Sequence, residues 1–275
     1  MQEPRHFRRI LWIWLGVSVV ATLLVVLVAA PGLPPGNSSN EGSAQVVDNT
    51  VLLGIATPIA VAIVVYFAYA LIVFRHRGPE LEEGVAIRGD NRVQLTWILV
   101  TSAIVLFAAV YGTVRLLNSG AGGGQGSDPI AKPSGNPLQV QVIAQQWAFT
   151  YRFPTYGGVE TAHLELPVDR DVELHVTSLD AIHSFWAHDL GVKADANPGV
   201  DNVAYVRPTK TRSFAIRCAE LCGLWHGHMF DTGEVVSDGA FLAWIRGQQR
   251  VFAPATSQLP PYRTRYEPDP QRRAG

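Results

Sequence analysis

The chain has 275 residues and a formal net charge of −1 at pH 7, and 48% of its residues are hydrophobic against 16% charged. Together with a positive mean hydropathy of +0.13, this composition excludes an ordinary soluble protein and predicts a membrane part joined to a water-facing part. We expect membrane lipid as a partner and no nucleic acid.

The first uncharged run predicts a membrane-spanning helix near the N-terminus. Residues 10–30 follow three arginines and contain 21 residues without charge, which is long enough to cross a bilayer. The end of the run also resembles a signal-peptide cleavage site, so residues 1–30 are either a retained span or a cleaved signal peptide. The length of the run favours the span.

Two further uncharged runs, 51–74 and 93–114, predict a transmembrane helical hairpin over residues 51–116. Residues 31–50 are rich in Gly, Pro, Ser and Asn, which predicts a loop. The connection 75–92 carries four arginines and is therefore expected on the cytoplasmic side, with the C-terminal part outside. A helical pair buried in a soluble core is the alternative, and the length of both runs argues against it.

The second half of the chain has the pattern of a β-sandwich. Residues 117–136 are rich in Gly and Ser and predict a linker. Short alternating runs then follow at 138–142, 172–176 and 213–216, separated by turn residues. These runs predict strands of one all-β domain over residues 137–250.

A short helix is expected at the end of this domain. Ser237 is a typical helix N-cap, and Phe241, Trp244 and Ile245 would form one apolar stripe that packs on the sandwich. We expect the Pro- and Arg-rich tail 251–275 to lie on the surface or to be poorly ordered.

Charge is distributed unevenly between these parts. Residues 128–238 contain fourteen acidic and eight basic residues, a balance of −6, whereas residues 239–275 have a balance of +4. An acidic domain favours a basic partner through electrostatic steering.

The segment 218–229, CAELCGLWHGHM, contains both cysteines of the chain. Its spacing offers two thiolates, an imidazole and a thioether, a soft ligand set that suits copper. A disulfide between Cys218 and Cys222 is an alternative that leaves the placing of His226 and Met229 unexplained. A structural zinc is another, but zinc has no use for the methionine.

This segment resembles the binuclear copper loop of the subunit II family of cytochrome c oxidases. His183, within the segment DAIHSFW, is similar to the remote histidine ligand of that family. The resemblance implies N-terminal transmembrane helices followed by a cupredoxin-type Greek-key β-sandwich. It also implies two copper ions held by His183, Cys218, the backbone carbonyl of Glu220, Cys222, His226 and Met229.

Other residues acquire expected roles from the same resemblance. The segment QQWAFTY is similar to the family's aromatic segment, in which Trp147 would receive the electron from cytochrome c. Asp195, in KADANPG, is a candidate for donor docking, although a turn-capping aspartate explains it equally well. The side chain of Glu220 would bind magnesium at the boundary with subunit I. Gln94 and Thr101 replace a Glu and a Pro at the mouth of the family's proton path, so the resemblance does not extend to a proton-uptake role for this chain.

The function implied is that of subunit II of a proton-translocating terminal oxidase in a bacterial plasma membrane, with subunits I and III and cytochrome c as partners. A membrane-anchored protein for copper delivery or sensing is the main alternative. A nitrous oxide reductase would need a large additional domain, and a quinol oxidase subunit would lack the ligands. We expect His188 and His228 not to bind metal, and His163 and His175 to be solvated or on strand faces.

Overall fold

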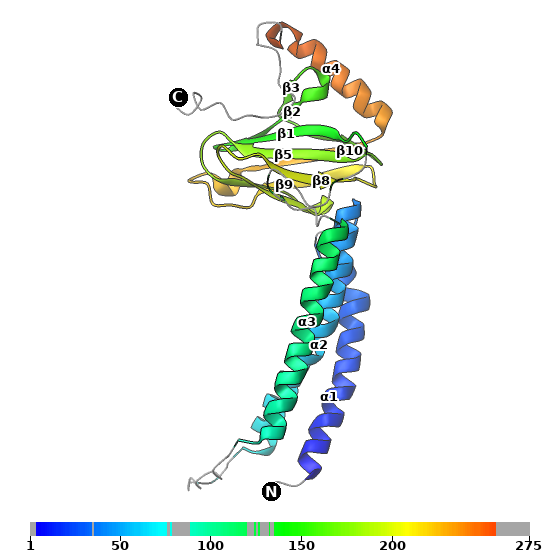
Figure 1. Ribbon diagram of the computed structural model, residues 1–275, viewed down its shortest axis with the longest axis vertical. Helices are drawn as coiled ribbons and strands as arrows, with labels where there is room; N and C mark the ends of the chain where they lie inside the picture. Colours follow the sequence, from blue (N-terminus) through cyan, green and yellow to red (C-terminus); the bar gives the residue numbers. More distant parts are fainter. Residues whose placement is uncertain are drawn as a thin grey trace. The chain divides into compact units, whose positions relative to one another are not determined.

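The computed structural model describes residues 4–34, 36–75, 78, 89–119, 124, 126, 132 and 135–256. The chain divides into two compact units (Figure 1). One unit comprises Met1–Gly32 and Asp48–Arg115, and the other comprises Leu33–Val47 and Leu116–Gly275.

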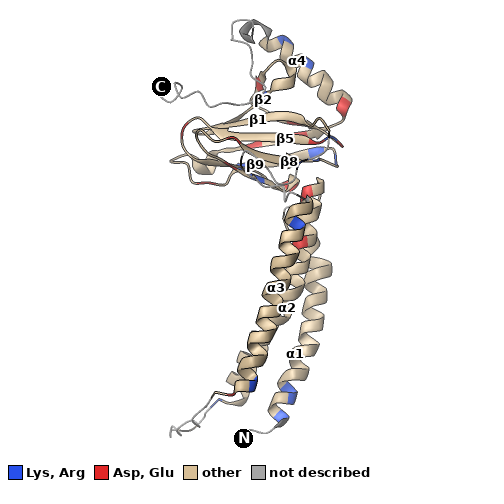
Figure 2. Ribbon diagram, in the orientation of Figure 1, with Lys and Arg blue, Asp and Glu red and all other residues tan. Residues whose placement is uncertain are grey.

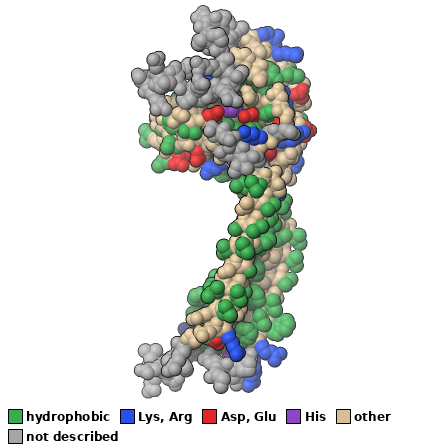
Figure 3. All heavy atoms as spheres, in the orientation of Figure 1, with side chains coloured by type: hydrophobic (Ala, Val, Ile, Leu, Met, Phe, Trp, Pro, Cys, Tyr) green, Lys and Arg blue, Asp and Glu red, His purple; other side chains and the backbone are tan. Residues whose placement is uncertain are grey.

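Three long helices dominate the first unit: α1 (Pro4–Leu24), α2 (Asn40–Val73) and α3 (Asn91–Ser119). A π-helical turn, η1 (Val25–Ala29), and a short 3-10 turn, η2 (Ala30–Gly32), continue α1. Apolar side chains cover the helices in Figure 3, and Figure 2 shows charged residues near their ends. All three are long and apolar enough to cross a membrane, which confirms the predicted membrane part.

Polar side chains connect the three helices. The indole N–H of Trp14 in α1 donates to the carbonyl oxygen of Pro58 in α2 at 2.8 Å. In α3, Tyr111 Oη and Arg115 Nε both lie 2.7 Å from Asp48 Oδ1 in α2. These contacts satisfy groups that would be costly to leave unpaired between apolar helices.

Helix α2 begins at Asn40, so the prediction of a loop over residues 31–50 is wrong for its second half. The N–H of Gly42 donates to Ser39 Oγ at 2.8 Å, and this contact caps the helix. The Ser- and Asn-rich composition thus marks a helix start here. Most of the expected cytoplasmic loop, residues 76–77 and 79–88, lies outside the described residues.

In the described part of the second unit, ten strands form two sheets of five, which confirms the predicted β-sandwich. The sheet orders are β3-β2-β1-β5-β8 and β4-β10-β9-β6-β7. The strands are β1 (Leu138–Gln145), β2 (Ala148–Phe153), β3 (Val159–Thr161), β4 (Glu165–Pro167), β5 (Val172–Ser178), β6 (His183–Ala187), β7 (Val192–Ala196), β8 (Asn202–Val206), β9 (Arg212–Cys218) and β10 (Phe230–Val236). Short 3-10 turns are η4 (Pro154–Tyr156), η5 (His188–Leu190) and η6 (His226–His228).

The core lies between the facing sides of the two sheets. Val140 in β1 is opposite Leu174 in the parallel neighbour β5, and both side chains are buried. Phe185, Phe214 and Ile216 complete the core from the other sheet. The period-two pattern of the sequence therefore reports correctly which side chains point inward.

The last helix, α4 (Asp238–Thr256), covers one end of this core. Ser237 precedes it, and Phe241 and Ile245 are fully buried, with the Phe241 and Phe153 rings 6.1 Å apart. The expected apolar stripe is confirmed, and the helix continues beyond residue 250. Residues 257–275 of the expected tail, and most of the expected linker 117–136, lie outside the described residues.

The segment Leu33–Val47 is part of the sandwich unit, which the sequence did not indicate. Ser39 Oγ donates to the carbonyl oxygen of Leu190 at 2.5 Å, and the N–H of Arg207 donates to Glu41 Oε2 at 2.9 Å. The upstream chain therefore contributes directly to the folded outer unit.

Candidate metal centre

Strand pairing brings the candidate ligands together from two distant parts of the sequence. His183 is the first residue of β6 and Cys218 is the last residue of β9. These strands are antiparallel neighbours, with Phe185 opposite Cys218. The loop after β9 then returns through η6, so that Met229 precedes β10. One end of one sheet thus gathers all the predicted ligands.

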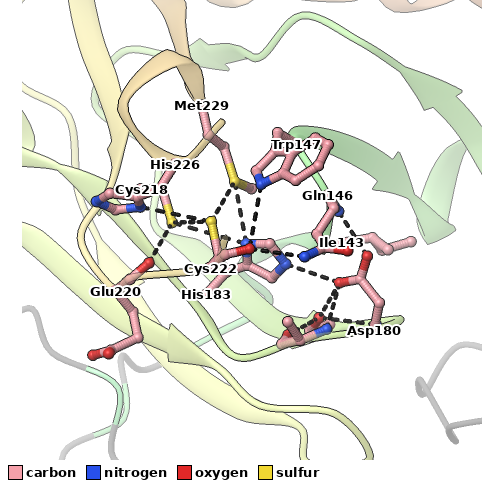
Figure 4. A network of polar contacts seen from close by, with 12 residues as sticks. Ile143, Gln146, Trp147, Asp180, His183, Cys218, Glu220, Cys222, His226 and Met229 are labelled. Carbon is pink, nitrogen blue, oxygen red and sulfur yellow. Dashed lines mark hydrogen bonds and ion pairs between the residues drawn. The ribbon is translucent and has the colours of Figure 1, made fainter. Parts of the chain in front are cut away.

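The donor atoms form a compact cluster (Figure 4). The sulfur atoms of Cys218 and Cys222 are 3.8 Å apart, and Cys222 Sγ lies 3.6 Å from His226 Nδ1. His183 Nδ1 lies 3.2 Å from Met229 Sδ, which is 3.8 Å from Cys222 Sγ. Both cysteines are free thiols, since a disulfide would place the sulfurs about 2 Å apart.

The centre of this cluster is dry. His183 is fully buried, and the exposed fractions of Met229, Cys222 and Cys218 are 2%, 3% and 9%. Burial and the neighbouring thiol of Cys218 raise the pKa of Cys222 to about 11. The thiol of Cys222 therefore keeps its proton at neutral pH, and a metal that binds it must displace that proton.

Glu220 contributes through its backbone rather than its side chain. The thiol of Cys218 contacts the Glu220 carbonyl oxygen at 3.3 Å, which directs this oxygen at the sulfur cluster. The carboxylate is exposed and points away from the cluster in Figure 4. The backbone carbonyl of Glu220 can therefore contact the cluster while its carboxylate remains free to bind another group.

Asp180 orients the buried histidine. Its Oδ1 lies 2.9 Å from His183 Nε2, and its Oδ2 accepts the N–H of Gln146 at 2.7 Å. Partial burial alone would raise the pKa of Asp180, but these hydrogen bonds outweigh it and lower the pKa below the usual value. An ionised Asp180 fixes the Nε2 proton of His183 and leaves Nδ1 directed at the sulfurs.

Trp147 lies beside residues 218–229, the loop that carries most of the candidate ligands and is called the ligand loop below. It is half-buried, and its indole N–H donates to the carbonyl oxygen of Cys222 at 3.2 Å. Asp195, in contrast, is exposed within β7, opposite Ser184, so the alternative of a turn-capping aspartate is wrong. The structure brings Trp147 to the cluster through a direct hydrogen bond to the candidate ligand Cys222.

Three further histidines in the described part of the chain, His175, His188 and His228, lie outside the cluster. His228 is exposed and stacks edge-on against Trp225, with ring centroids 5.3 Å apart. His188 lies next to Asp189. His175 is on a strand face as expected, but it is buried, and its Nδ1 lies 2.9 Å from Asp201 Oδ2.

Sequence reasoning left Asp180 and Gln146 without a role. Each is adjacent to a residue that was assigned: Asp180 is three positions before His183, and Gln146 directly precedes Trp147. Metal-bound histidines usually donate their second ring nitrogen to a carboxylate, so an Asp close to a candidate His ligand is the signal that could have found Asp180.

The donor set fits copper. His183, Cys218 and Cys222 have ligand atoms within 4.8 Å of one another, and a thioether lies against them. Thiolate, imidazole and thioether together favour a soft metal. A zinc site would give Met229 no role, although the fold buries its sulfur among the other donors.

Comparisons with known proteins show similarity to subunit II of cytochrome c oxidases. Residues 159–236 match the family described as cytochrome C oxidase subunit II, periplasmic domain. The cytochrome c oxidase subunit 2 of Thermostichus vulcanus is 28% identical, over 87% of this chain and 86% of that protein. The corresponding protein of Synechocystis sp. is 27% identical, over 77% of each. Among solved structures, the periplasmic domain of subunit II of cytochrome oxidase from Bradyrhizobium japonicum is 29% identical, with a TM-score of 0.42, over 44% of this chain and 98% of that chain.

Proposed function

The chain belongs to the cytochrome c oxidase subunit II family, and from that premise we propose that its outer domain accepts single electrons from a cytochrome c at a two-copper centre. The electrons then pass to the haem-bearing subunit I, where oxygen is reduced and protons are translocated. We also propose that subunit III is a partner and that the complex lies in a bacterial plasma membrane, with the sandwich on its outer face.

The observation that carries this proposal is the pair of thiols 3.8 Å apart at the centre of a ring of other donors. The sulfurs of Cys218 and Cys222, together with the imidazoles of His183 and His226, would hold two metal ions, and the thioether and the Glu220 carbonyl would be weaker donors. When bound, a copper pair that shares one electron would spread the change in charge over both ions and both thiolates. The proposed ligands are His183, Cys218, the Glu220 carbonyl, Cys222, His226 and Met229.

The surrounding residues keep this ligand set in place. The carboxylate of Asp180 contacts Nε2 of His183 and orients the ring, and burial excludes water from the sulfur atoms. Ligands that cannot move when the charge changes favour fast electron transfer. The protein supplies every donor in the cluster, which suits a relay better than a site that must bind a substrate.

Trp147 is the proposed acceptor of the incoming electron. The residue is half-buried and its indole N–H donates to the Cys222 carbonyl, so a docked donor and a proposed ligand residue can both contact it. The balance of −6 over residues 128–238 favours a basic donor, and the exposed carboxylate of Asp195 is a proposed docking contact.

Glu220 is the proposed link to subunit I. Its carbonyl faces the sulfur cluster while its carboxylate points outward. Carboxylate oxygen is a preferred ligand of magnesium, so a magnesium ion at the boundary with subunit I would connect the copper centre to the haem-bearing partner.

Copper binding to the full-length chain tests the two-metal assignment. We expect about two copper ions per chain and a paramagnetic resonance signal shared by two copper nuclei. A single-copper spectrum under copper excess would contradict the relay proposal and favour copper delivery or sensing.

Substitution of Trp147 tests the proposed path. In the purified oxidase, Trp147→Phe should slow electron transfer from the protein donor by about tenfold or more, equal to about 1.4 kcal/mol of activation free energy. The copper spectrum should stay unchanged, because the indole is not a ligand. Trp244→Phe on α4, which packs against Phe153, is the matched control and should transfer electrons at the wild-type rate.

A further inference from the structure

Gln146 lies in the turn between β1 and β2 and makes contacts in two directions (Figure 4). Its side-chain Nε2 donates to the carbonyl oxygen of Cys222 at 2.8 Å. Its backbone N–H donates to Asp180 Oδ2 at 2.7 Å. One residue therefore contacts the ligand loop directly and reaches the buried histidine through Asp180.

The Cys222 carbonyl is shared between two neighbouring donors. It accepts the side-chain amide of Gln146 and the indole N–H of Trp147, at 2.8 and 3.2 Å. A carbonyl oxygen has two lone pairs and can accept both. The shorter contact comes from Gln146, so its amide constrains the position of the oxygen that Trp147 also uses.

Gly223 shows how closely the ligand loop approaches this turn. Its backbone has φ +115°, and a Cβ atom there would lie 3.0 Å from Gln146 Nε2 and 3.5 Å from Trp147 Nε1. A glycine is needed for this conformation and for the close approach. The loop thus passes directly against both side chains immediately after Cys222.

We infer that Gln146 is a positioning residue for electron uptake: its amide holds the Cys222 carbonyl where the indole N–H of Trp147 can donate to it. This inference rests on the proposed function, in which Trp147 accepts the electron. Loss of the amide leaves every metal ligand in place but loosens the contact between Trp147 and the ligand loop. The effect is then confined to the step between Trp147 and the copper centre.

The test compares Gln146→Met, which keeps the length of the side chain without its donor, with Gln145→Met, the neighbouring exposed glutamine. In the copper-free full-length chain in detergent, labelled with 15N-tryptophan, we measure hydrogen exchange of the Trp147 indole N–H. The signal is assigned with Trp147→Phe. Exchange should become about fivefold faster in Gln146→Met, because one of two hydrogen bonds that order this contact is lost, and should not change in Gln145→Met.

The second measurement uses the purified oxidase. Electron transfer from the protein donor should slow about fivefold in Gln146→Met, with an unchanged copper spectrum and an unchanged KM for the donor. Gln146→Asn, whose shorter side chain keeps the amide, should lie between Gln146→Met and the wild type.

Three results would overturn the inference: unchanged indole exchange, an unchanged transfer rate while Trp147→Phe is slow, or an altered copper spectrum in Gln146→Met. The last would make Gln146 a support of the metal site instead. If Trp147→Phe transfers electrons at the wild-type rate, the proposed path itself is wrong, whereas the indole exchange still reports whether Gln146 positions Trp147.

Discussion

The two histidines of the proposed ligand set lie in contrasting surroundings. His183 begins a strand, is fully buried and is held by Asp180. His226 lies in the short turn η6, is partly exposed, and follows Leu224 and Trp225, which are 85% and 50% exposed. The sheet fixes the first histidine, whereas the second depends on the loop and on its spacing from Cys222.

This difference separates two tasks within one site. His183, at the start of β6, is rigidly anchored, because its ring cannot turn without breaking its partly buried hydrogen bond to Asp180. The loop side exposes apolar side chains, including Leu221, which is 78% exposed. Clustered apolar side chains on a surface are typical of a region that another protein covers. We expect the strand side of the site, which contains His183 and Asp180, to govern metal affinity. We expect the loop side, which contains His226 and its exposed neighbours, to govern contact with partners.

The largest expected effect comes from the cysteines, one of which lies on each side. Cys218→Ser on β9 and Cys222→Ser in the loop should each abolish the two-copper signal, because both thiolates are proposed to hold the copper ions. Copper content and paramagnetic resonance of the full-length chain measure this loss. An intact two-nucleus spectrum in either variant would remove that cysteine from the ligand set.

Asp180→Ala tests the strand side alone. Removing the carboxylate that orients His183 should lower copper affinity by about 10- to 100-fold, the usual cost of losing such a partner. Asp195→Ala in β7 is the matched control and should keep wild-type affinity, since its side chain is exposed. Competition with a copper chelator measures both. Equal affinities in the two variants would mean that His183 needs no anchor.

Met229→Leu should have a smaller effect at the same site. The thioether is the weakest of the proposed donors, so copper should stay bound and its reduction potential should shift, by tens of mV as an order of magnitude. A redox titration followed by visible absorption measures the shift. Loss of copper in this variant would show that copper binding requires Met229.

The smallest effect is expected at His175, which lies in the other sheet. Burial lowers its pKa, but Asp201 and Glu173 outweigh this and raise the pKa above its usual value. The charged form therefore stabilises the fold fully below about pH 6.5, and this contribution is lost as pH rises through the folded-state pKa.

His175→Gln should accordingly destabilise the chain by about 1–2 kcal/mol at acidic pH and by less at alkaline pH. Thermal unfolding at several pH values, followed by circular dichroism, measures the difference. Copper affinity should not change. A destabilisation that grows with pH would contradict the assigned direction of the pKa shift.

Prediction from sequence succeeded where a local pattern determines the structure. The spans, the strands around Val140 and Leu174, and the stripe with Phe241 follow from periodicity and length alone. It failed at residues 40–50, because Ser39 acts as a cap only once the upstream chain packs against Leu190. The role of Gln146 was missed because its side-chain hydrogen bond joins residues 76 positions apart. Asp180 was missed although it is only three positions before His183, because the spacing alone does not show where its carboxylate points.

The sequence by itself determined the kinds of donor, their spacing in one loop and the division into a membrane part and a β-sandwich, since these depend on composition and short-range order. Only the tertiary structure decided which histidine is anchored, that the thiols are dry and 3.8 Å apart, and that Trp147 contacts the Cys222 carbonyl. The physical reason is that burial and hydrogen bonding between distant segments arise only when strands such as β6 and β9 pair.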